Sequence, residues 1–425
     1  MTAGPVRLGL RANARQFALL VGLNALVGAL IGLERTVLPL VGESDFGVSS
    51  KTAVLAFIAA FGSAKAVANL VAGRLAEAAG RKRLLVAGWV LAFPAAALVG
   101  VAPGWGWIVV ANLFLGASQG LTWSLTVFMK IDLAGPRRRG LALGLNESAG
   151  YVGLAVTAFA TGALAGALAP RTLVWAGAGA LALAGLAASV LFIRDTAAHV
   201  RVEDEGGART TRHEPVIRAC AQAGFVNNLN DALAWGLAPL YLATAGATIG
   251  EIGIVAAVYP AVWGFGQLGT GWLSDRAGRK PLIVLGMAVQ ALALAALLGG
   301  GGEFAPALAA AVLLGAGTAL AYPTLIAAVA DAVPPTQRAR AVGAYRFWRD
   351  AGLVAGALAA GSLADALGSG WAIGIVAGAT AASGVWVALA RWAVPVPPPD
   401  HPGKRWPTST GSTGRTDSVG VPSGR

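Results

Sequence analysis

The amino-acid sequence predicts an all-α integral membrane protein whose twelve transmembrane helices form two pseudo-symmetric bundles of six. Three observations lead to this fold class: a composition suited to lipid, twelve long apolar segments and an internal repeat. Only 12% of the 425 residues are charged and 56% are hydrophobic, whereas about 25% of the residues in a soluble domain are charged. The mean hydropathy of +0.67 also favours a chain that lies mostly in a bilayer.

The twelve apolar segments lie between charged breaks or breaks that contain Gly or Pro. Each segment is long enough to cross the hydrocarbon core of a bilayer as a straight or tilted helix. In chain order the segments are 16–41, 50–73, 84–102, 106–129, 140–167, 172–193, 217–243, 250–272, 281–300, 305–330, 341–364 and 371–392.

The basic residues between these segments predict the orientation in the membrane. If the N-terminus is cytoplasmic, most of the 32 Lys and Arg residues fall in cytoplasmic tails and loops, and only Lys51 and Arg171 fall in outside loops. Cytoplasmic loops of membrane proteins carry such an excess of basic residues. We therefore expect both termini in the cytoplasm and the protein in the plasma (inner) membrane. The net charge of +12 is then explained by topology, and no nucleic-acid partner is expected.

One long polar stretch, "RDTAAHVRVEDEGGARTTRHEP", divides the twelve segments into six and six. It predicts a cytoplasmic linker at 194–215 between an N-terminal bundle at 1–193 and a C-terminal bundle at 216–393. Residues 394–425 are rich in Pro, Ser, Thr and Gly, which predicts a disordered cytoplasmic tail.

The two halves repeat each other at a distance of about 200 residues, which is typical of transporters with a substrate site between two repeats. The matching pairs are Val71–Lys82 with Gly269–Lys280, Pro39 with Pro239, and "NESAG" at 146–150 with "WRDAG" at 348–352.

The first of these pairs is a charged loop between two apolar segments, "GTGWLSDRAGRK" at Gly269–Lys280. Its glycines permit a tight turn, and its carboxylate can pair with a basic side chain or with the positive N-terminus of a helix. The residues that define the loop are Gly271, Leu273, Asp275, Arg276, Gly278, Arg279 and Lys280, repeated in the first half by Gly73, Leu75, Gly80, Arg81 and Lys82. The first copy has Glu77 in place of Asp and Ala78 in place of Arg.

This loop resembles the signature between the second and third helices of each half in the major facilitator superfamily (MFS). Together with the twelve segments, the resemblance extends to about Trp392, and within the superfamily the chain resembles bacterial drug-efflux members. It implies a cytoplasmic gate in which Asp275 meets the start of the fifth helix near Arg139 and Gly140. Glu77 is expected to meet the start of the eleventh helix near Arg340, as a weaker latch because its copy departs from the pattern. The alternative is a solvated basic loop.

Ionisable residues inside the membrane usually face a cavity or one another, and this sequence has four acids and four bases there. They are Glu34, Glu147, Asp231, Asp350, Arg35, Lys65, Arg346 and Arg349. At a rise of about 1.5 Å per residue, Lys65 and Asp350 have a similar depth. In the superfamily that the chain resembles, the second and eleventh helices pack across the interface between the halves, so Lys65 and Asp350 are the predicted ion pair.

Asp231 is the best candidate for a carboxylate that exchanges protons, because burial in the membrane favours its neutral form. It ends the most polar run in any apolar segment, "NNLND", with Asn227 and Asn230. Glu147 is the second candidate, and the alternative for both is a structural salt bridge or hydrogen-bond network. For Glu34 and Arg35, near the outer end of the first helix, the alternative is snorkelling to the membrane surface.

The function expected from these features is proton-coupled efflux of a small organic solute by alternating access, driven by the proton gradient without a cofactor or metal. Gly116, three residues before Gln119, and the absence of proline from Leu145–Val156 depart from the drug-efflux pattern. The alternative is a proton-coupled importer or facilitator of an organic anion or nutrient, with Lys65, Arg346 and Arg349 receiving the anion.

An enzyme is not expected, because no apolar segment pairs a nucleophile with a base and all three histidines lie in polar stretches. The expected partners are the lipid bilayer, a small-molecule substrate and protons, and the chain is expected to act as a monomer.

Overall fold

The computed structural model describes residues 6–47, 51–164, 169–205 and 212–392, and these are helical apart from short connections. The predicted tail at 394–425 lies outside them. The elements are α1 (Ala14–Ser44), α2 (Lys51–Ala79), α3 (Arg81–Val101), α4 (Trp105–Ala134), α5 (Arg139–Leu164), α6 (Pro170–Leu191), α7 (Ala197–Glu205), α8 (Glu214–Ala232), the π-helical turn η1 (Leu233–Leu237), α9 (Ala238–Thr244), α10 (Ile249–Ala277), α11 (Arg279–Gly299), α12 (Phe304–Asp331), the 3-10 turn η2 (Pro335–Gln337), α13 (Arg338–Leu367) and α14 (Ser369–Leu389).

The helices match the predicted spans one for one when α8, η1 and α9 are counted as a single span. Ten of the described helices are long and apolar enough to cross a membrane. The other two spans, α5 and α8–η1–α9, carry the polar runs around Glu147 and Asp231, which lower their hydropathy. The twelve-helix, all-α fold class is therefore confirmed.

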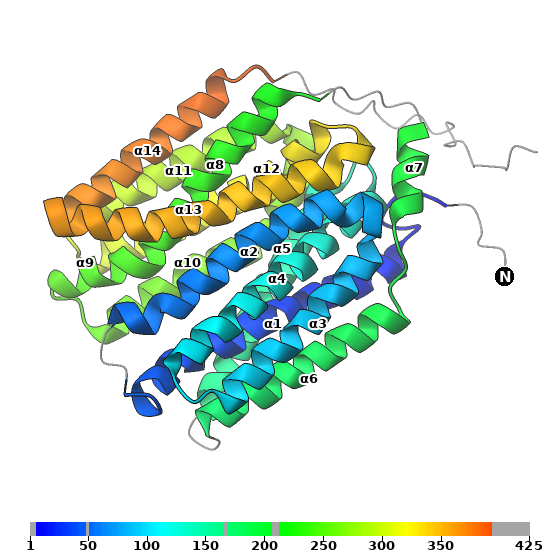
Figure 1. The fold of residues 1–425 in the computed structure, drawn as a ribbon. Coiled ribbons are helices and arrows are strands. Elements are labelled where there is room, and N and C mark those ends of the chain that lie inside the picture. Colours follow the sequence, from blue (N-terminus) through cyan, green and yellow to red (C-terminus); the bar gives the residue numbers. More distant parts are fainter. Residues whose placement is uncertain (1–5, 48–50, 165–168, 206–211, 393–425) are drawn as a thin grey trace, which may run out of the picture.

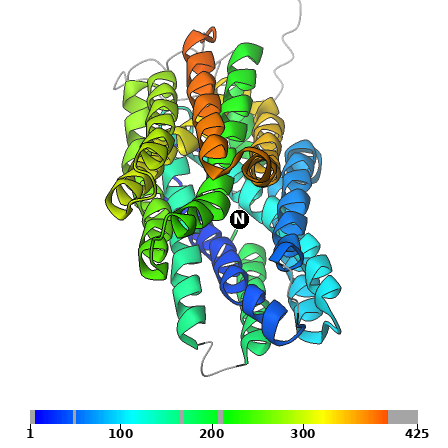
Figure 2. The ribbon, with the colours of Figure 1, turned by 90° about the vertical axis from the view of Figure 1, so that its left-hand side faces the viewer.

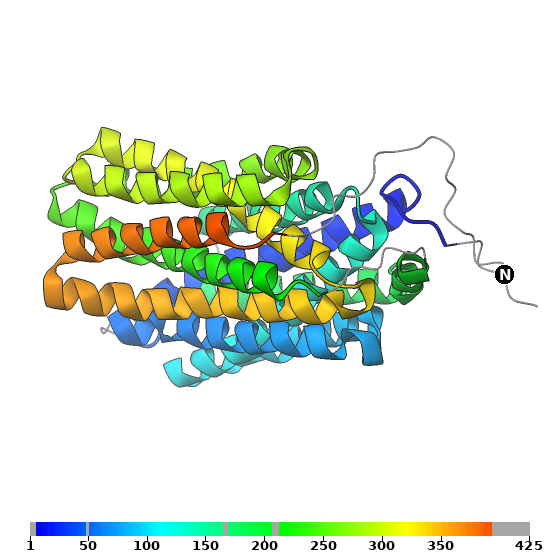
Figure 3. The same cartoon turned by 90° about the horizontal axis from the view of Figure 1, so that it is seen from above.

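The six helices α1–α6 and the helices α8–α14 lie on opposite sides of an interface (Figure 1, Figure 2). Across it, α2 packs against α13 and α5 packs against α10. The short helix α7 lies at one end of the bundle, the end at which α1 also begins (Figure 1, Figure 3). We call this end the α7 face, and it is the end that the sequence predicts to be cytoplasmic.

Glycines bring the two halves into backbone contact near the α7 face. A Cβ atom on Gly343 of α13 would lie 2.7 Å from the Cα atom of Gly73 on α2. On the other side of the interface, a Cβ atom on Gly271 of α10 would lie 3.1 Å from the carbonyl carbon of Gly140 on α5. Small residues of this kind let transmembrane helices approach closely, and here they close the α7 face.

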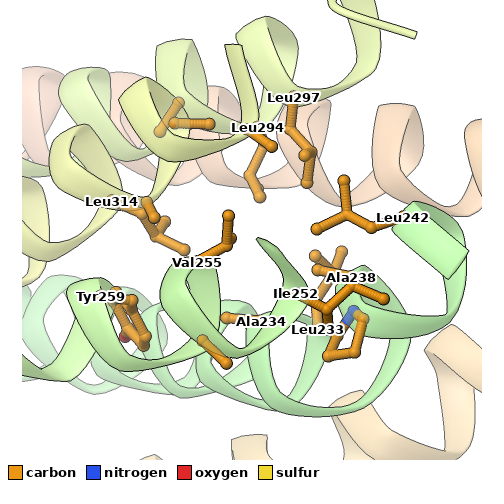
Figure 4. Close-up of a pocket in the computed structure, with 16 residues that line it drawn as sticks. Leu233, Ala234, Ala238, Leu242, Ile252, Val255, Tyr259, Leu294, Leu297 and Leu314 are labelled. Atoms are coloured by element: carbon orange, nitrogen blue, oxygen red, sulfur yellow. The ribbon is translucent and has the colours of Figure 1, made fainter. Parts of the chain in front are cut away.

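The seventh span widens into the π-helical turn η1 directly after Asp231 and Ala232. Beside η1 lies an apolar cavity of about 30 Å³ within the second half, with Leu233, Leu242 and Leu294 among its walls (Figure 4). Single π-helical turns are frequent at functional sites, and this one starts two residues beyond a candidate proton-binding carboxylate.

Candidate functional site

A second cavity, of about 40 Å³, lies at the interface between the two halves. Its walls come from α1, α2, α4 and α5 on one side and from α8, η1, α12 and α13 on the other. They combine aromatic and charged side chains. The residues are Ile31, Phe61, Gly62, Lys65, Trp123, Tyr151, Leu154, Asn228, Asp231, Trp235, Tyr322, Arg349, Asp350 and Leu353.

Asp350 joins the two halves at this cavity. The predicted ion pair is present, with Lys65 Nζ 3.6 Å from Asp350 Oδ2. Asn69 on α2 donates a hydrogen bond of 2.7 Å to the same oxygen, and Arg349 Nη1 lies 3.3 Å from Oδ1. The carboxylate therefore receives donors from both α2 and α13.

Asp231 is buried and shares Arg349 with Asp350. Arg349 Nη2 lies 3.3 Å from Asp231 Oδ2, and the Tyr259 hydroxyl donates a short hydrogen bond to Oδ1. The guanidinium of Arg349 also lies 3.9 Å from the centre of the Tyr322 ring, within range of a cation–π interaction. One arginine thus connects a carboxylate on α8 to the carboxylate that holds the halves together.

Glu147 is fully buried behind Trp123 and Tyr322 rather than in the cavity wall. Trp123 Nε1 lies 3.1 Å from both carboxylate oxygens, and the Tyr322 hydroxyl donates to Oε2 at 2.9 Å. Asn146 Nδ2 donates to Oε1 at 2.8 Å, while its Oδ1 accepts a short hydrogen bond from the buried Lys130. Glu147 is therefore held by neutral donors from α4, α5 and α12.

Arg346 is the cation nearest to Glu147, at 3.7 Å from Nη1 to Oε1. That separation is too long for a hydrogen bond. Both Nε and Nη1 of Arg346 are buried without a hydrogen-bond partner among the described residues. A buried guanidinium with unused donors is costly unless another group meets them.

The remaining predicted pathway residues lie away from the cavity. Asn227 and Asn230 both donate to Gln290 Oε1 on α11, at 2.9 and 3.0 Å, and so tie α8 into its own half. Their neighbour Asn228 faces the cavity instead and donates to the backbone oxygen of Arg349 at 2.8 Å.

Glu34 does not snorkel, because it is 2% exposed and packed near Phe57, Phe61 and Asn112. The side chain of Arg35 lies outside what the structure describes.

The gate loop of the second half forms the predicted latch. Asp275 accepts hydrogen bonds of 2.9 Å from the backbone N–H groups of Gly140 and Leu141, at the first turn of α5. Its carboxylate also pairs with Arg279 Nη2 at 2.7 Å. An acidic side chain satisfies the free N–H groups at a helix N-terminus and interacts favourably with the helix dipole. Gly278 makes the turn into α11 with a φ of 89°, a conformation that glycine tolerates.

The corresponding loop of the first half is bonded differently. Gly80 makes the same turn with a φ of 86°, and Lys82 and Lys280 cap equivalent helix ends, at Val190 O (2.8 Å) and Ala390 O (3.0 Å). The predicted latch between Glu77 and the start of α13 near Arg340 is not formed among the described residues. Glu77 forms no hydrogen bond or ion pair with any described residue.

In the second copy, Arg276 points outward and stacks on Trp272, with 3.9 Å between its guanidinium and the ring centre. This side chain therefore lies outside the latch.

Two aspartates at the ends of α4 and α12 complete the gate, and the sequence analysis missed both. Asp331 pairs with Arg139 Nη1 at 2.5 Å and with Arg279 Nε at 3.0 Å. Its counterpart Asp132 is held more loosely, at 3.4 Å from Arg81 Nε and 4.0 Å from Arg338 Nη1. The repeat could have revealed them, because Asp132 in "KIDLAG" and Asp331 in "VADAVP" are separated by the repeat distance of about 200 residues.

Glu203 of α7 connects these two networks. It is 2% exposed, lies 2.8 Å from Arg338 Nη2 and forms a short ion pair with Arg139. Burial alone would raise the pKa of Glu203, but the two guanidinium groups outweigh it and hold the pKa below its ordinary value. The predicted linker thus contributes a buried acid that contacts both halves, which its polar sequence did not reveal.

Comparisons with known proteins agree with this geometry. The family model for the Major Facilitator Superfamily matches residues 18–223 and 220–410. The human organic anion transporter MFSD10 (TETRAN) is similar in structure, with a TM-score of 0.73, 14% identity and coverage of 88% of this chain and 99% of its own. The proton:xylose symporter XylE has a TM-score of 0.72, 14% identity and coverage of 88% and 96%. A single-residue variant of the E. coli fucose:proton symporter FucP has a TM-score of 0.68, 17% identity and coverage of 88% and 97%.

Proposed function

The chain belongs to the Major Facilitator Superfamily and is a multi-pass membrane transporter rather than an enzyme, and on that premise we propose that it exports a small organic solute in exchange for protons. We place it in the plasma membrane with the α7 face in the cytoplasm, where its many basic residues belong. The observation that carries the proposal is the buried Asp231, which shares one arginine with the carboxylate that joins the halves.

Protonation of Asp231 changes which carboxylate Arg349 pairs with. While ionised, Asp231 competes with Asp350 for Arg349. Nη2 of this arginine lies 3.3 Å from Asp231, and Nη1 lies 3.3 Å from Asp350. A proton on Asp231 removes that competition, so Arg349 is held by Asp350 alone. Proton binding on α8 is thereby transmitted to the Lys65–Asp350 contact between α2 and α13, which must change when the halves move.

The cavity wall favours an organic solute with an apolar or aromatic part. Trp123, Tyr151, Trp235 and Tyr322 face the same cavity as Asp231, and aromatic side chains supply large contact areas with a few polar atoms. A solute in this cavity meets the same side chains that respond to the proton. Competition between solute and proton for one set of groups is the requirement for exchange.

The test is proton flux in liposomes that contain the purified protein and a pH-sensitive dye. Addition of toxic cations, neutral drugs or organic anions to the wild type is expected to start a proton flux opposite to the movement of one of them. Asp231→Asn is expected to abolish that flux, whereas Asp365→Asn, at an exposed carboxylate of α13, leaves it unchanged. Solute movement without protons in the wild type would contradict the proposed exchange.

A second candidate, proton-coupled uptake of an organic anion, is favoured by the unused donors of Arg346. Protonation of Glu147 removes the nearest negative charge from Arg346 and leaves it free for a carboxylate or similar anion. In this case the solute and the proton move in the same direction. The same liposomes separate the two functions, because anion entry then acidifies the lumen and Arg346→Gln abolishes it.

A further inference from the structure

A recess of about 350 Å³ opens on the α7 face, beside the gate and lined by none of the residues that line the central cavity. One wall is the N-terminal turn before α1, and the other is the loop between α4 and α5. The ten residues that line it include two leucines, three arginines and the glycine at which the second wall turns. These are Leu8, Leu10, Gly135, Arg11, Arg137 and Arg138.

The recess is built by hydrogen bonds that fold the N-terminal turn back onto the end of α4. The N–H of Gly9 donates to Leu133 O at 2.8 Å, and Asn13 Nδ2 donates to Arg7 O at 2.7 Å and to Gly9 O at 3.1 Å. On the opposite wall, Gly135 turns the chain with a φ of 67°. The shape therefore comes from the backbone of both walls and does not depend on the positions of long side chains.

The charge of the recess is strongly positive. Arg11, Arg137 and Arg138 are exposed around it. Arg137 already interacts with another group, and none of the described residues that line the recess is acidic. Guanidinium groups and backbone N–H groups are the donors that proteins use to bind phosphate oxygens. A phosphate-bearing group is thus the chemistry that the recess fits.

The position of the recess places it at the membrane surface. It lies where the apolar helix α1 begins, at Ala14, and where α4 ends, at Ala134, which is the level of lipid headgroups. Leu8 and Leu10 are partly buried at its edge, where the glycerol and the first acyl carbons of a lipid would lie. Basic pockets beside transmembrane helices bind anionic headgroups.

We propose that this recess binds the phosphodiester headgroup of one anionic phospholipid. The lipid would hold the N-terminal turn against α4. Asn13, the residue that fixes the turn, also lies 3.2 Å from His199 Nε2 on α7, so the bound lipid would support the helix that carries Glu203. The proposal depends on membrane insertion and not on the identity of the transported solute or the direction of transport.

The test is native mass spectrometry of the full chain in neutral detergent, titrated with phosphatidylglycerol or phosphatidylcholine. One tightly bound phosphatidylglycerol is expected. The triple variant Arg11→Gln, Arg137→Gln, Arg138→Gln is expected to weaken it by on the order of 100-fold, because each arginine near a membrane surface contributes roughly a factor of five. The matched control is Arg74→Gln, Arg83→Gln, Arg201→Gln, which removes three exposed arginines elsewhere on the α7 face.

Three outcomes of these experiments would contradict the proposal. Equal weakening in both triple variants would replace the site by a diffuse basic surface, and equal binding of phosphatidylcholine would remove the need for an anionic headgroup. Glycerol 3-phosphate tests a soluble source of the same chemistry: if it displaces the lipid and binds alone with the same dependence on the three arginines, the lipid assignment is wrong. Unchanged thermal unfolding of both variants, measured in parallel, keeps loss of binding separate from loss of fold.

Discussion

The two sides of the gate occupy equivalent positions in the repeat but are held with different strength. Between α5 and α10, Asp275 accepts two backbone hydrogen bonds and pairs with Arg279. Between α2 and α13, Glu77 forms no bond with a described residue. The aspartates behind them follow the same trend, with ion pairs of 2.5 and 3.0 Å for Asp331 and of 3.4 and 4.0 Å for Asp132.

The difference has a backbone cause as well as a side-chain cause. In α5 the residues Gly140 and Leu141 belong to the first turn, where N–H groups lack a partner inside the helix. In α13 the turn η2 leads directly into the helix, and no described side chain accepts a hydrogen bond from the N–H groups at 339 and 340. Glu77 therefore does not cap the start of α13 as Asp275 caps the start of α5.

The comparison teaches that a repeat can keep the positions of a gate while placing the polar contacts on one side. At the α7 face the α2–α13 side relies on the close packing of Gly73 and Gly343, and its polar contacts with Asp350 lie deeper, at the central cavity. The α5–α10 side adds a charged latch to similar packing at the face itself. We expect the α2–α13 side to separate at the lower free-energy cost. The following substitutions test this asymmetry. In each, spin labels on pairs of introduced cysteines, in a Cys220→Ala background, report the distance across one side of the gate.

Glu203→Gln is expected to have the largest effect and to affect both sides alike. It leaves Arg139 and Arg338 buried without the acid that lies between them, and removal of one partner from a buried ion pair costs about 3 kcal/mol or more. The closed α7 face should lose population by more than about 100-fold relative to the open one. Electron-spin distances between labels at Arg138 and Ala277, and between labels at Ala78 and Thr336, report the two sides separately.

The pH dependence of this contact has a defined sign. Because the pKa of Glu203 is held below its ordinary value of 4.5, the closed state keeps this contribution at neutral and mildly acidic pH. The contribution is lost as the pH falls through the lowered pKa. If the wild type opened as the pH fell but was still above 4.5, and Glu203→Gln did not, this assignment would be wrong.

Asp275→Asn is expected to have an intermediate effect on one side only. An amide keeps one acceptor for Gly140 or Leu141 but loses the charge that pairs with Arg279, a change of about 1 to 2 kcal/mol for a largely buried charged cap. The share of molecules with a long distance between the labels at Arg138 and Ala277 should be about tenfold larger than in the wild type. An equal change between the α2 and α13 labels would show that the sides are not independent.

Glu77→Gln is expected to have the smallest effect, within about 0.5 kcal/mol, because an exposed charge without a bonded partner contributes little. The label distances on both sides and the transport rate should match those of the wild type. A change as large as that of Asp275→Asn would mean that the two latches are equivalent in the membrane, and the asymmetry would then be wrong.

The sequence predicted the spans from the pattern of apolar segments. It predicted the Lys65–Asp350 pair and the contact of Asp275 with α5 only with the help of the resemblance to the superfamily, which supplied the helix arrangement. It did not predict which asparagine faces the cavity. Asn227 and Asn228 differ by one residue, hence by about 100° around a helix, and the rotation of α8 is decided by its packing against α12, α13 and α14. The role of Glu203 also escaped prediction, because an acid in a polar stretch has the same local pattern whether it is solvated or buried.

The apolar cavity beside η1 gives the second half a compressible volume. Its walls are apolar except for Tyr259, whose hydroxyl bonds to Asp231, so its roughly 30 Å³ offers little to hold water. Pressure favours whichever state has less internal void. The wide turn η1 borders this space at Leu233. Any step of the transport cycle that changes this void changes the molar volume, so hydrostatic pressure becomes a way to displace the equilibrium beside Asp231.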